Sequence, residues 1–218
     1  MSRITTSSQM NRPIIEWGSS YTRFRTSPGQ CGPAIKFSLM KVMVDTCHDL
    51  VFRTAFRIMC DRMDAECVSA KVFSAVRRSD PGFSLQSEGV EDALLHKTCR
   101  YCYIKILQRR LSWLFGEQRP VFVRAIPEVD HHDDYIVKQA WQLYCRACFK
   151  MSPLQIIVYA LSELECVSVE RTASILGLTT FRVRVALSRA VTSVRRELSL
   201  YGSERQYHAY VAFIRQVH

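Results

Sequence analysis

The 218-residue sequence lacks the motifs on which many enzyme classes depend. It contains no phosphate-binding G-x-x-x-x-G-K-[ST] loop, no G-x-S-x-G nucleophile motif and no H-E-x-x-H zinc motif. We therefore expect a protein that is not an enzyme, with no catalytic residues, no cofactor and no metal site.

The sequence also lacks a long apolar run. No stretch approaches the roughly 20 apolar residues that a helix needs to cross a bilayer. The first ten residues, MSRITTSSQM, lack the apolar centre of a signal peptide. These absences predict a cytoplasmic protein without a membrane partner. No internal repeat or low-complexity tract stands out.

Composition and charge indicate a folded protein with a polyanionic partner. Apolar residues make up 48% of the chain and charged residues 23%, which is usual for a globular protein with a core. The net charge of +10 is typical of proteins that bind a polyanion such as nucleic acid or an anionic membrane surface, and of these two we expect nucleic acid.

The nine cysteines are an odd number in a chain without an export signal, so we expect reduced thiols that serve as small core residues. Two C-x-x-C pairs, Cys99 with Cys102 and Cys145 with Cys148, have the spacing of zinc ligands. Each pair falls within an expected helix, where positions three apart share a face. Burial in the core is therefore the favoured interpretation of both pairs.

The stretch from Ser168 to Ala190 has the pattern of two short helices joined at one glycine. Ser168 is suited to cap the first helix, and Gly177 supplies the positive φ that ends it. Leu178 fills the corner, and Thr179 or Thr180 caps the second helix.

Val183 and Leu187 share one face of that second helix, which leaves Arg182, Arg184 and Arg189 to project elsewhere. This pattern predicts a helix-turn-helix with a basic recognition helix. The alternative is an ordinary helical hairpin with a solvated basic face.

Helical spacing also recurs before this stretch. Asp61 is suited to cap a helix that ends near Arg78, and a long helix is expected from Glu91 to Arg110. Cations and aromatic residues are interleaved along the expected outer side of the long helix: Lys97, Arg100, Tyr101, Tyr103, Lys105, Arg109 and Arg110. Such a surface suits melted DNA, because rings stack on bases and cations neutralise phosphates. The alternative is that these long side chains only cover the helix surface.

Three stretches, in this order, resemble the extracytoplasmic-function type of bacterial RNA polymerase sigma factors. Residues Asp61–Arg78 (DRMDAECVSAKVFSAVRR) are similar to the family pattern D-x-x-D-A-E-D-L-V-Q-E-V-F. Residues Leu94–Arg110 resemble its W-L-Y-R-I-A-R-N-L-A-L-D-x-L-R-R helix. Residues Met151–Glu165, continuing into the helix-turn-helix stretch, resemble L-P-P-R-Q-R-E-V-F-x-L-R-E-x-E and S-Y-E-E-I-A-x-I-L-G-I-S. The resemblance covers residues 45 to 198, about two thirds of the chain.

The resemblance implies an all-α fold of two small helical domains on a flexible linker. Its expected parts are a flexible N-terminal extension (1–38), a region 2-like domain (39–113), a linker (114–134), a region 4-like domain with the helix-turn-helix (135–200) and a C-terminal extension (201–218). The implied partners are promoter DNA and core RNA polymerase, through the clamp helices of its largest subunit and the flap of its β subunit. Whether an anti-sigma factor is a further partner stays open.

The resemblance also implies roles for particular residues. Those expected to read the −35 element are Thr179, Thr180, Arg182, Arg184, Ser188 and Arg189. Those expected at the −10 element are Phe83, Lys97, Arg100, Tyr101 and Lys105. Those expected to bind polymerase are Asp61, Asp64, Glu66 and Phe73.

Some positions depart from the family pattern. Ala70 and Lys71 replace its Gln-Glu pair, which removes negative charge from the polymerase-facing helix, and Ala186 replaces a usual arginine of the recognition helix. The sequence therefore predicts a divergent sigma factor that directs promoter-specific initiation of transcription. The alternatives are a helix-turn-helix regulator that acts without polymerase, and a sigma-like adaptor recruited by another complex.

Overall fold

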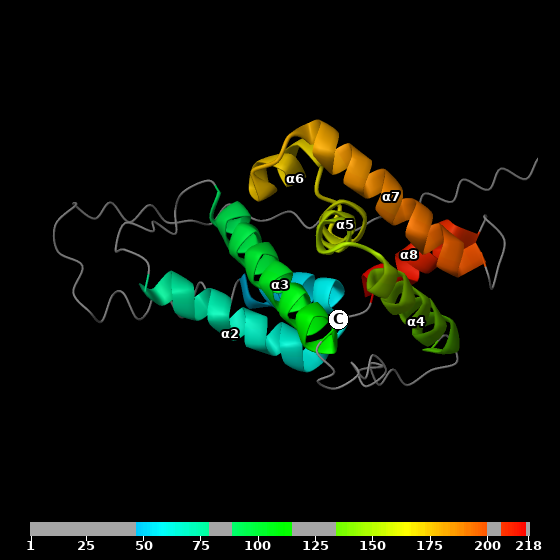
Figure 1. Ribbon diagram of the computed structural model, residues 1–218, viewed down its shortest axis with the longest axis horizontal. Coiled ribbons are helices and arrows are strands. Elements are labelled where there is room, and N and C mark those ends of the chain that lie inside the picture. The colour runs from blue at the N-terminus through cyan, green and yellow to red at the C-terminus, as the bar shows by residue number, and fades with distance from the viewer. Residues whose placement is uncertain (1–46, 79–88, 115–133, 200–205, 217–218) are drawn as a thin grey trace, which may run out of the picture.

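The structure is a computed structural model that describes residues 47–78, 89–114, 134–199 and 206–216. Within these ranges the chain forms helices and no strand, which confirms the all-α class (Figure 1). A first helix occupies residues 47–59 of the described chain. It is followed by α2 (Arg62–Arg78), α3 (Val90–Leu114), α4 (Asp134–Lys150), α5 (Pro153–Tyr159), the π-helical turn η1 (Ala160–Leu164), α6 (Val169–Leu176), α7 (Thr180–Ser199) and α8 (Gln206–Gln216). The expected N-terminal extension, Phe83 and nearly all of the expected linker lie outside the described residues.

The starts of α2 and α5 are fixed by local capping residues. The Asp61 carboxylate accepts a hydrogen bond of 2.8 Å from the Asp64 amide, which satisfies a free N–H in the first turn of α2. Ser152 and Gln155 form a reciprocal capping box, with Pro153 at the first position of α5. The expected helix start at Asp61 is confirmed, and Ser152 caps α5.

The helix after Pro153 is not α-helical throughout. The α-helix ends at Tyr159 and continues as the π-helical turn η1, which stops at Leu164. Cys166 then adopts a positive φ of 56°. This local change leaves backbone carbonyl groups at Glu163 and Leu164 that accept hydrogen bonds from arginines elsewhere in the chain.

One buried apolar cluster joins the helices of the two expected domains. The ring of Phe56, from the first helix, stacks on that of Trp141 in α4 with centroids 4.9 Å apart. The Tyr144 hydroxyl donates a 2.8 Å hydrogen bond to the carbonyl of Arg57 across the same boundary. The two segments therefore share a core over the described residues.

The C-terminal segment contributes to this core as well. Helix α8 packs against α4, and its apolar face is buried through Tyr207, Tyr210, Val211 and Ile214. Helix α8 lies within the expected C-terminal extension (201–218).

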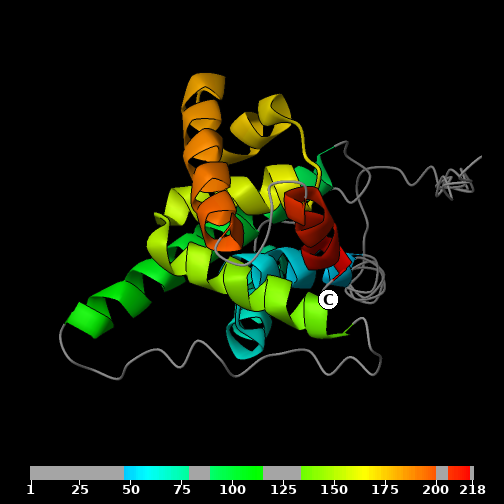
Figure 2. The same ribbon diagram turned by 90° about the vertical axis from the view of Figure 1, so that its right-hand side faces the viewer.

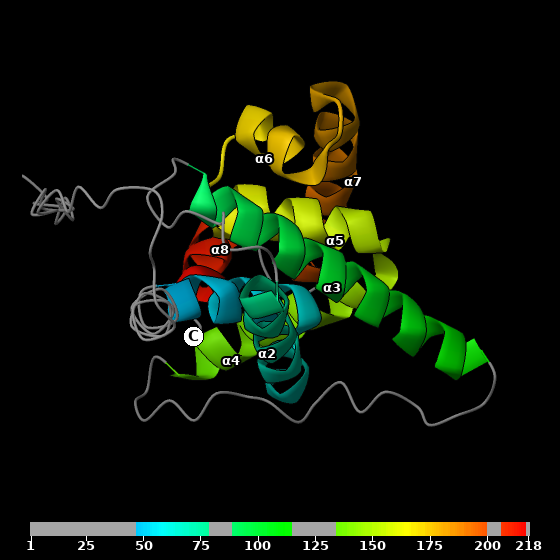
Figure 3. The ribbon, with the colours of Figure 1, turned by 90° about the vertical axis from the view of Figure 1, so that its left-hand side faces the viewer.

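The helix-turn-helix lies at one end of the molecule. In Figures 1, 2 and 3, α6 and the first turns of α7 are at the top, while α4 and α8 lie below them. Figure 3 shows α3 crossing the body and its C-terminal end projecting beyond α5. Among the described helices, none has the length and apolar character needed to span a bilayer.

Candidate nucleic-acid interface

The first helix of the helix-turn-helix is held at both ends by local hydrogen bonds. The Ser168 hydroxyl accepts from the Arg171 amide at 3.2 Å, as the sequence predicted for the N-cap. On the inner side Thr172, Ala173 and Ile175 are buried. The small side chain of Ala173 permits the close approach of α6 and α7 at this corner.

Gly177 makes the turn, with φ 62° and ψ 37° in the left-handed region. The amide of Gly177 donates to the carbonyl of Ser174 at 3.2 Å, and the amide of Leu178 donates to that of Ala173 at 2.9 Å. These two bonds form a Schellman motif. A Cβ at Gly177 would meet no atom within 4 Å, so the requirement for glycine comes from the backbone angle and not from space.

The second helix begins where the Thr179 hydroxyl accepts from the Arg182 amide at 3.4 Å, which makes Thr179 the capping residue. The inner face of α7 is anchored by Val183 and Ala186, both buried in a small cluster with Ala173 and Val158. Ala186, at the position where the resembled family usually has an arginine, is 6% exposed in this cluster.

The structure brings together the residues expected to read the −35 element on one surface of α7 and its cap. All of them are exposed: Thr179, Thr180, Arg182, Arg184, Ser188 and Arg189. The Arg184 guanidinium lies 3.3 Å from the Glu170 carboxylate, but the two side chains are 68% and 66% exposed. Such an exposed pair contributes little, so Arg184 remains available to a stronger anionic partner.

The sequence interpretation missed Phe181, which lies on the same surface and is 73% exposed. A signal for it was present. Phe181 falls on the side of α7 opposite to Val183, Ala186 and Ala190, which form the buried face.

Helix α3 differs from the expected continuous basic-aromatic face. Lys105 lies 3.4 Å from Asp64 of α2, and Arg109 forms ion pairs with Asp64 and Asp61. Of the other residues expected at the −10 element, Arg100 is exposed, whereas Lys97 and Tyr101 are half-buried. An apolar stripe follows Arg100 on the exposed face and consists of Tyr103, Ile104, Leu107 and Leu111.

The residues expected to bind polymerase have unequal surroundings. Asp61 caps α2, and Asp64 is largely enclosed by cations of α3. Glu66 is exposed and pairs with Arg62 at 3.1 Å. Phe73 is half-buried, with its ring stacked on that of His48.

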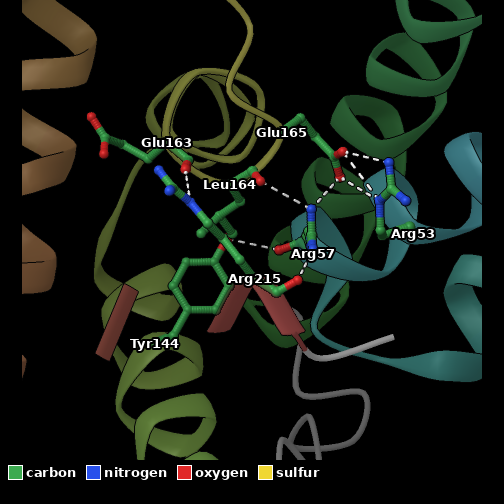
Figure 4. Close-up of polar contacts among 7 residues, drawn as sticks. All are labelled: Arg53, Arg57, Tyr144, Glu163, Leu164, Glu165 and Arg215. Atoms are coloured by element: carbon green, nitrogen blue, oxygen red, sulfur yellow. Dashed lines mark hydrogen bonds and ion pairs between the residues drawn. The ribbon is translucent and has the colours of Figure 1, made fainter. Parts of the chain in front are cut away.

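A buried ionic cluster, which sequence reasoning did not find, connects the first helix to the segment after η1. Figure 4 shows the Glu165 carboxylate between two guanidinium groups, those of Arg53 at 3.0 Å and Arg57 at 2.7 Å. Arg57 also donates to the carbonyls of Leu164 and Arg215. Burial lowers the pKa of Arg57, although the Glu165 carboxylate opposes that shift.

Helix α3 is tied to the helix-turn-helix by a second ionic contact. Arg171 of α6 lies 2.7 Å from Asp92 and 3.3 Å from Glu91, both in the first turn of α3. Hydrogen bonding to Asp92 raises the pKa of Arg171. The start of the candidate −10 helix is therefore held beside the helix that supports the candidate −35 reader.

The C-x-x-C cysteines are buried, as expected for core thiols. Burial raises the pKa of Cys99 to about 12, and it raises the pKa of Cys102 and Cys148 well above the ordinary value. Neutral thiols are therefore favoured at these positions. Within the described part of the chain, no group of three or more Cys, His, Asp or Glu side chains has an arrangement that could hold a metal ion.

Comparison with known proteins finds no family model and no curated protein that matches this chain.

Proposed function

We propose that the chain binds duplex DNA through α7 and acts as a sigma factor of the extracytoplasmic-function type, which directs core RNA polymerase to promoters. The observation that carries the proposal is the corner at Gly177. Its left-handed conformation turns the chain so that the start of α7 is exposed at one end of the molecule. There α7 presents Arg182 and Arg189 to solvent.

The shape and charge of this surface suit the major groove. The groove is about 12 Å wide and admits one α-helix. The inner face of α7 is anchored by Val183 and Ala186, so the exposed face can enter the groove without disturbing the core. Arginines on that face suit guanine edges or phosphates, and the net charge of +10 favours approach to DNA.

The sigma-type function assigns a second task to α3, which is contact with the melted −10 element. In support, Arg100 is exposed, and Tyr103 provides an exposed ring close by on the same face. A cation and a ring together suit an unpaired strand, because the ring stacks on a base while the cation neutralises a phosphate.

A second candidate function is a helix-turn-helix regulator that binds DNA without polymerase. Two observations favour it. The carboxylate of Asp64, expected to face polymerase, is paired within the chain by Lys105 and Arg109. In addition, the two expected domains share one core, whereas a promoter clamp has to span two DNA elements.

Two experiments test these functions with the full chain. The first incubates the purified protein with core RNA polymerase and measures co-purification and initiation on promoter libraries. Co-purification with promoter-dependent initiation supports the sigma factor. DNA binding in the absence of any association with core polymerase supports the regulator instead.

The second experiment measures affinity for a selected duplex at increasing salt. Affinity should fall steeply, with a logarithmic slope of about −0.9 for each phosphate neutralised. Arg182→Ala should weaken binding and make the slope about one unit shallower if Arg182 meets a phosphate. Arg62→Ala removes an equal charge from the exposed surface of α2 and should leave the slope unchanged. Equal effects of the two substitutions would contradict α7 as the DNA surface.

A further inference from the structure

The most unusual residue of the candidate DNA surface is Phe181. Its side chain is 73% exposed in the second position of α7. A large apolar side chain that remains in contact with water gives up the stabilisation that burial would provide. The helix is anchored without it, because Val183 and Ala186 already fill the corner beneath α7. The fold therefore does not account for a phenylalanine at this position.

The position of Phe181 around the helix is informative. At about 100° per residue, Phe181 and Ser188 fall near the middle of the exposed face of α7. Arg182 and Arg189 fall on one side of that line, and Arg184 falls on the other. A helix that enters a groove with this face places its middle against the base edges and its flanks toward the phosphates on either side.

We propose that Phe181 is a specificity-determining residue that contacts the C5-methyl group of a thymine in the major groove. The thymine methyl is the apolar group that unmodified base pairs present on that edge, and phenylalanine is among the side chains suited to it. Contact would bury the exposed ring against the methyl. The inference rests on the proposed binding of duplex DNA by α7 and adds to it one base identity and the residue that reads it.

The arginines beside Phe181 favour DNA over an apolar protein surface as the partner. A protein that covered Phe181 would also have to approach the guanidinium groups of Arg182 and Arg184. In the major groove those same groups lie against phosphates. One helix face then uses its apolar centre for base recognition and its charged flanks for attachment.

The test uses the full chain and a duplex selected from a random-sequence library. Each thymine of the selected duplex is replaced in turn by deoxyuridine, which removes only the methyl group. Wild-type protein should lose about fourfold in affinity at one thymine, the factor expected for one buried methyl group. The Phe181→Ala variant should bind the thymine and uracil versions equally well.

The controls separate this proposal from the one on which it rests. Arg182→Ala should bind both duplexes more weakly and keep the fourfold preference for thymine. Circular dichroism checks that Phe181→Ala folds, which its exposed position favours. If wild-type protein selects a duplex but tolerates uracil at every thymine, or if Phe181→Ala keeps the preference, Phe181 does not read a methyl group. If no duplex is selected, DNA binding by α7 fails, and the role of Phe181 fails with it.

Discussion

The substitution Glu165→Ala should lower the free energy of unfolding substantially, because it removes one partner of a buried ion pair. The Glu165 carboxylate, whose side chain is only 5% exposed, faces the guanidinium groups of Arg53 and Arg57. Arg57 is itself 4% exposed, and its remaining hydrogen-bond acceptors are the neutral carbonyls of Leu164 and Arg215. Removing Glu165 therefore leaves a buried cation without its counter-charge.

The magnitude follows from the burial of both groups. Loss of one partner of a buried ion pair costs about 3–5 kcal/mol, because the remaining charge stays desolvated. Arg53 should contribute less to this loss, since its side chain is 31% exposed and water can replace the carboxylate there. Against a total stability of about 5–15 kcal/mol for a folded domain, the loss is a large fraction. Glu165→Gln keeps the shape of the side chain and one oxygen acceptor, so it should lower the free energy of unfolding less than Glu165→Ala does.

The assay is urea unfolding followed by two probes. Far-UV circular dichroism reports the helices, and the fluorescence of Trp141 reports the boundary where its ring stacks on Phe56. Trp17→Phe and Trp113→Phe make Trp141 the sole tryptophan, since the chain has three. Glu170→Ala is the matched control, because it breaks an ion pair with Arg184 that is about two thirds exposed on each side. That control should cost less than about 1 kcal/mol.

Two results would refute the reasoning. If Glu165→Ala costs no more than Glu170→Ala, the buried cluster does not stabilise the fold. If Glu165→Ala is as destabilising as predicted but Arg57→Ala in the same background recovers nothing, the cost does not arise from the unpaired guanidinium. Removal of that cation should restore part of the lost free energy, since no charge then remains buried.

Two further predictions concern the turn and the buried thiols. Gly177→Ala should lower the free energy of unfolding by about 1–2 kcal/mol, because alanine at φ 62° is strained, and Gly177→Asn should lower it less. Equal stability of the wild type and both variants in urea unfolding would contradict this prediction. The free energy of unfolding should fall as pH rises from about 9 toward 12, because the folded state keeps Cys99 protonated, with its pKa raised to about 12, after the unfolded thiol has ionised. In a pH series of urea unfolding midpoints, Cys99→Ala should make this fall with pH less steep. An equally steep fall in the variant would show that other groups cause it.

The sequence was sufficient to predict the structure where it depends on residues a few positions apart in the chain. Asp61, Ser168 and Gly177 act through backbone groups within a few positions, so their spacing alone identified the caps and the turn. The buried face of α7 was likewise visible as a helical period of small and apolar residues.

The sequence was insufficient to predict contacts between residues that lie far apart along the chain. Glu165 lies 108 positions from Arg57, and nothing in either local pattern relates them. The same applies to Lys105 and Arg109, which helical spacing assigned to an outer basic face, whereas α2 supplies Asp64 as their partner. Spacing shows which residues share a face, but only packing shows whether that face meets solvent or another helix.

The two candidate functions make opposite demands on the boundary between the halves of the chain. A regulator that uses only α7 can keep Phe56 stacked on Trp141, since the recognition surface is already exposed. A promoter clamp has to separate α3 from the helix-turn-helix, and separation breaks the contacts of Glu165 with Arg57 and of Asp92 with Arg171. Separation would also open the apolar cluster that both halves share, including the stack of Phe56 on Trp141. Core polymerase should therefore change the fluorescence of Trp141 if the protein is a promoter clamp, because separation of the halves removes Phe56 from its ring. The fluorescence should stay unchanged if the protein is a regulator that acts without polymerase.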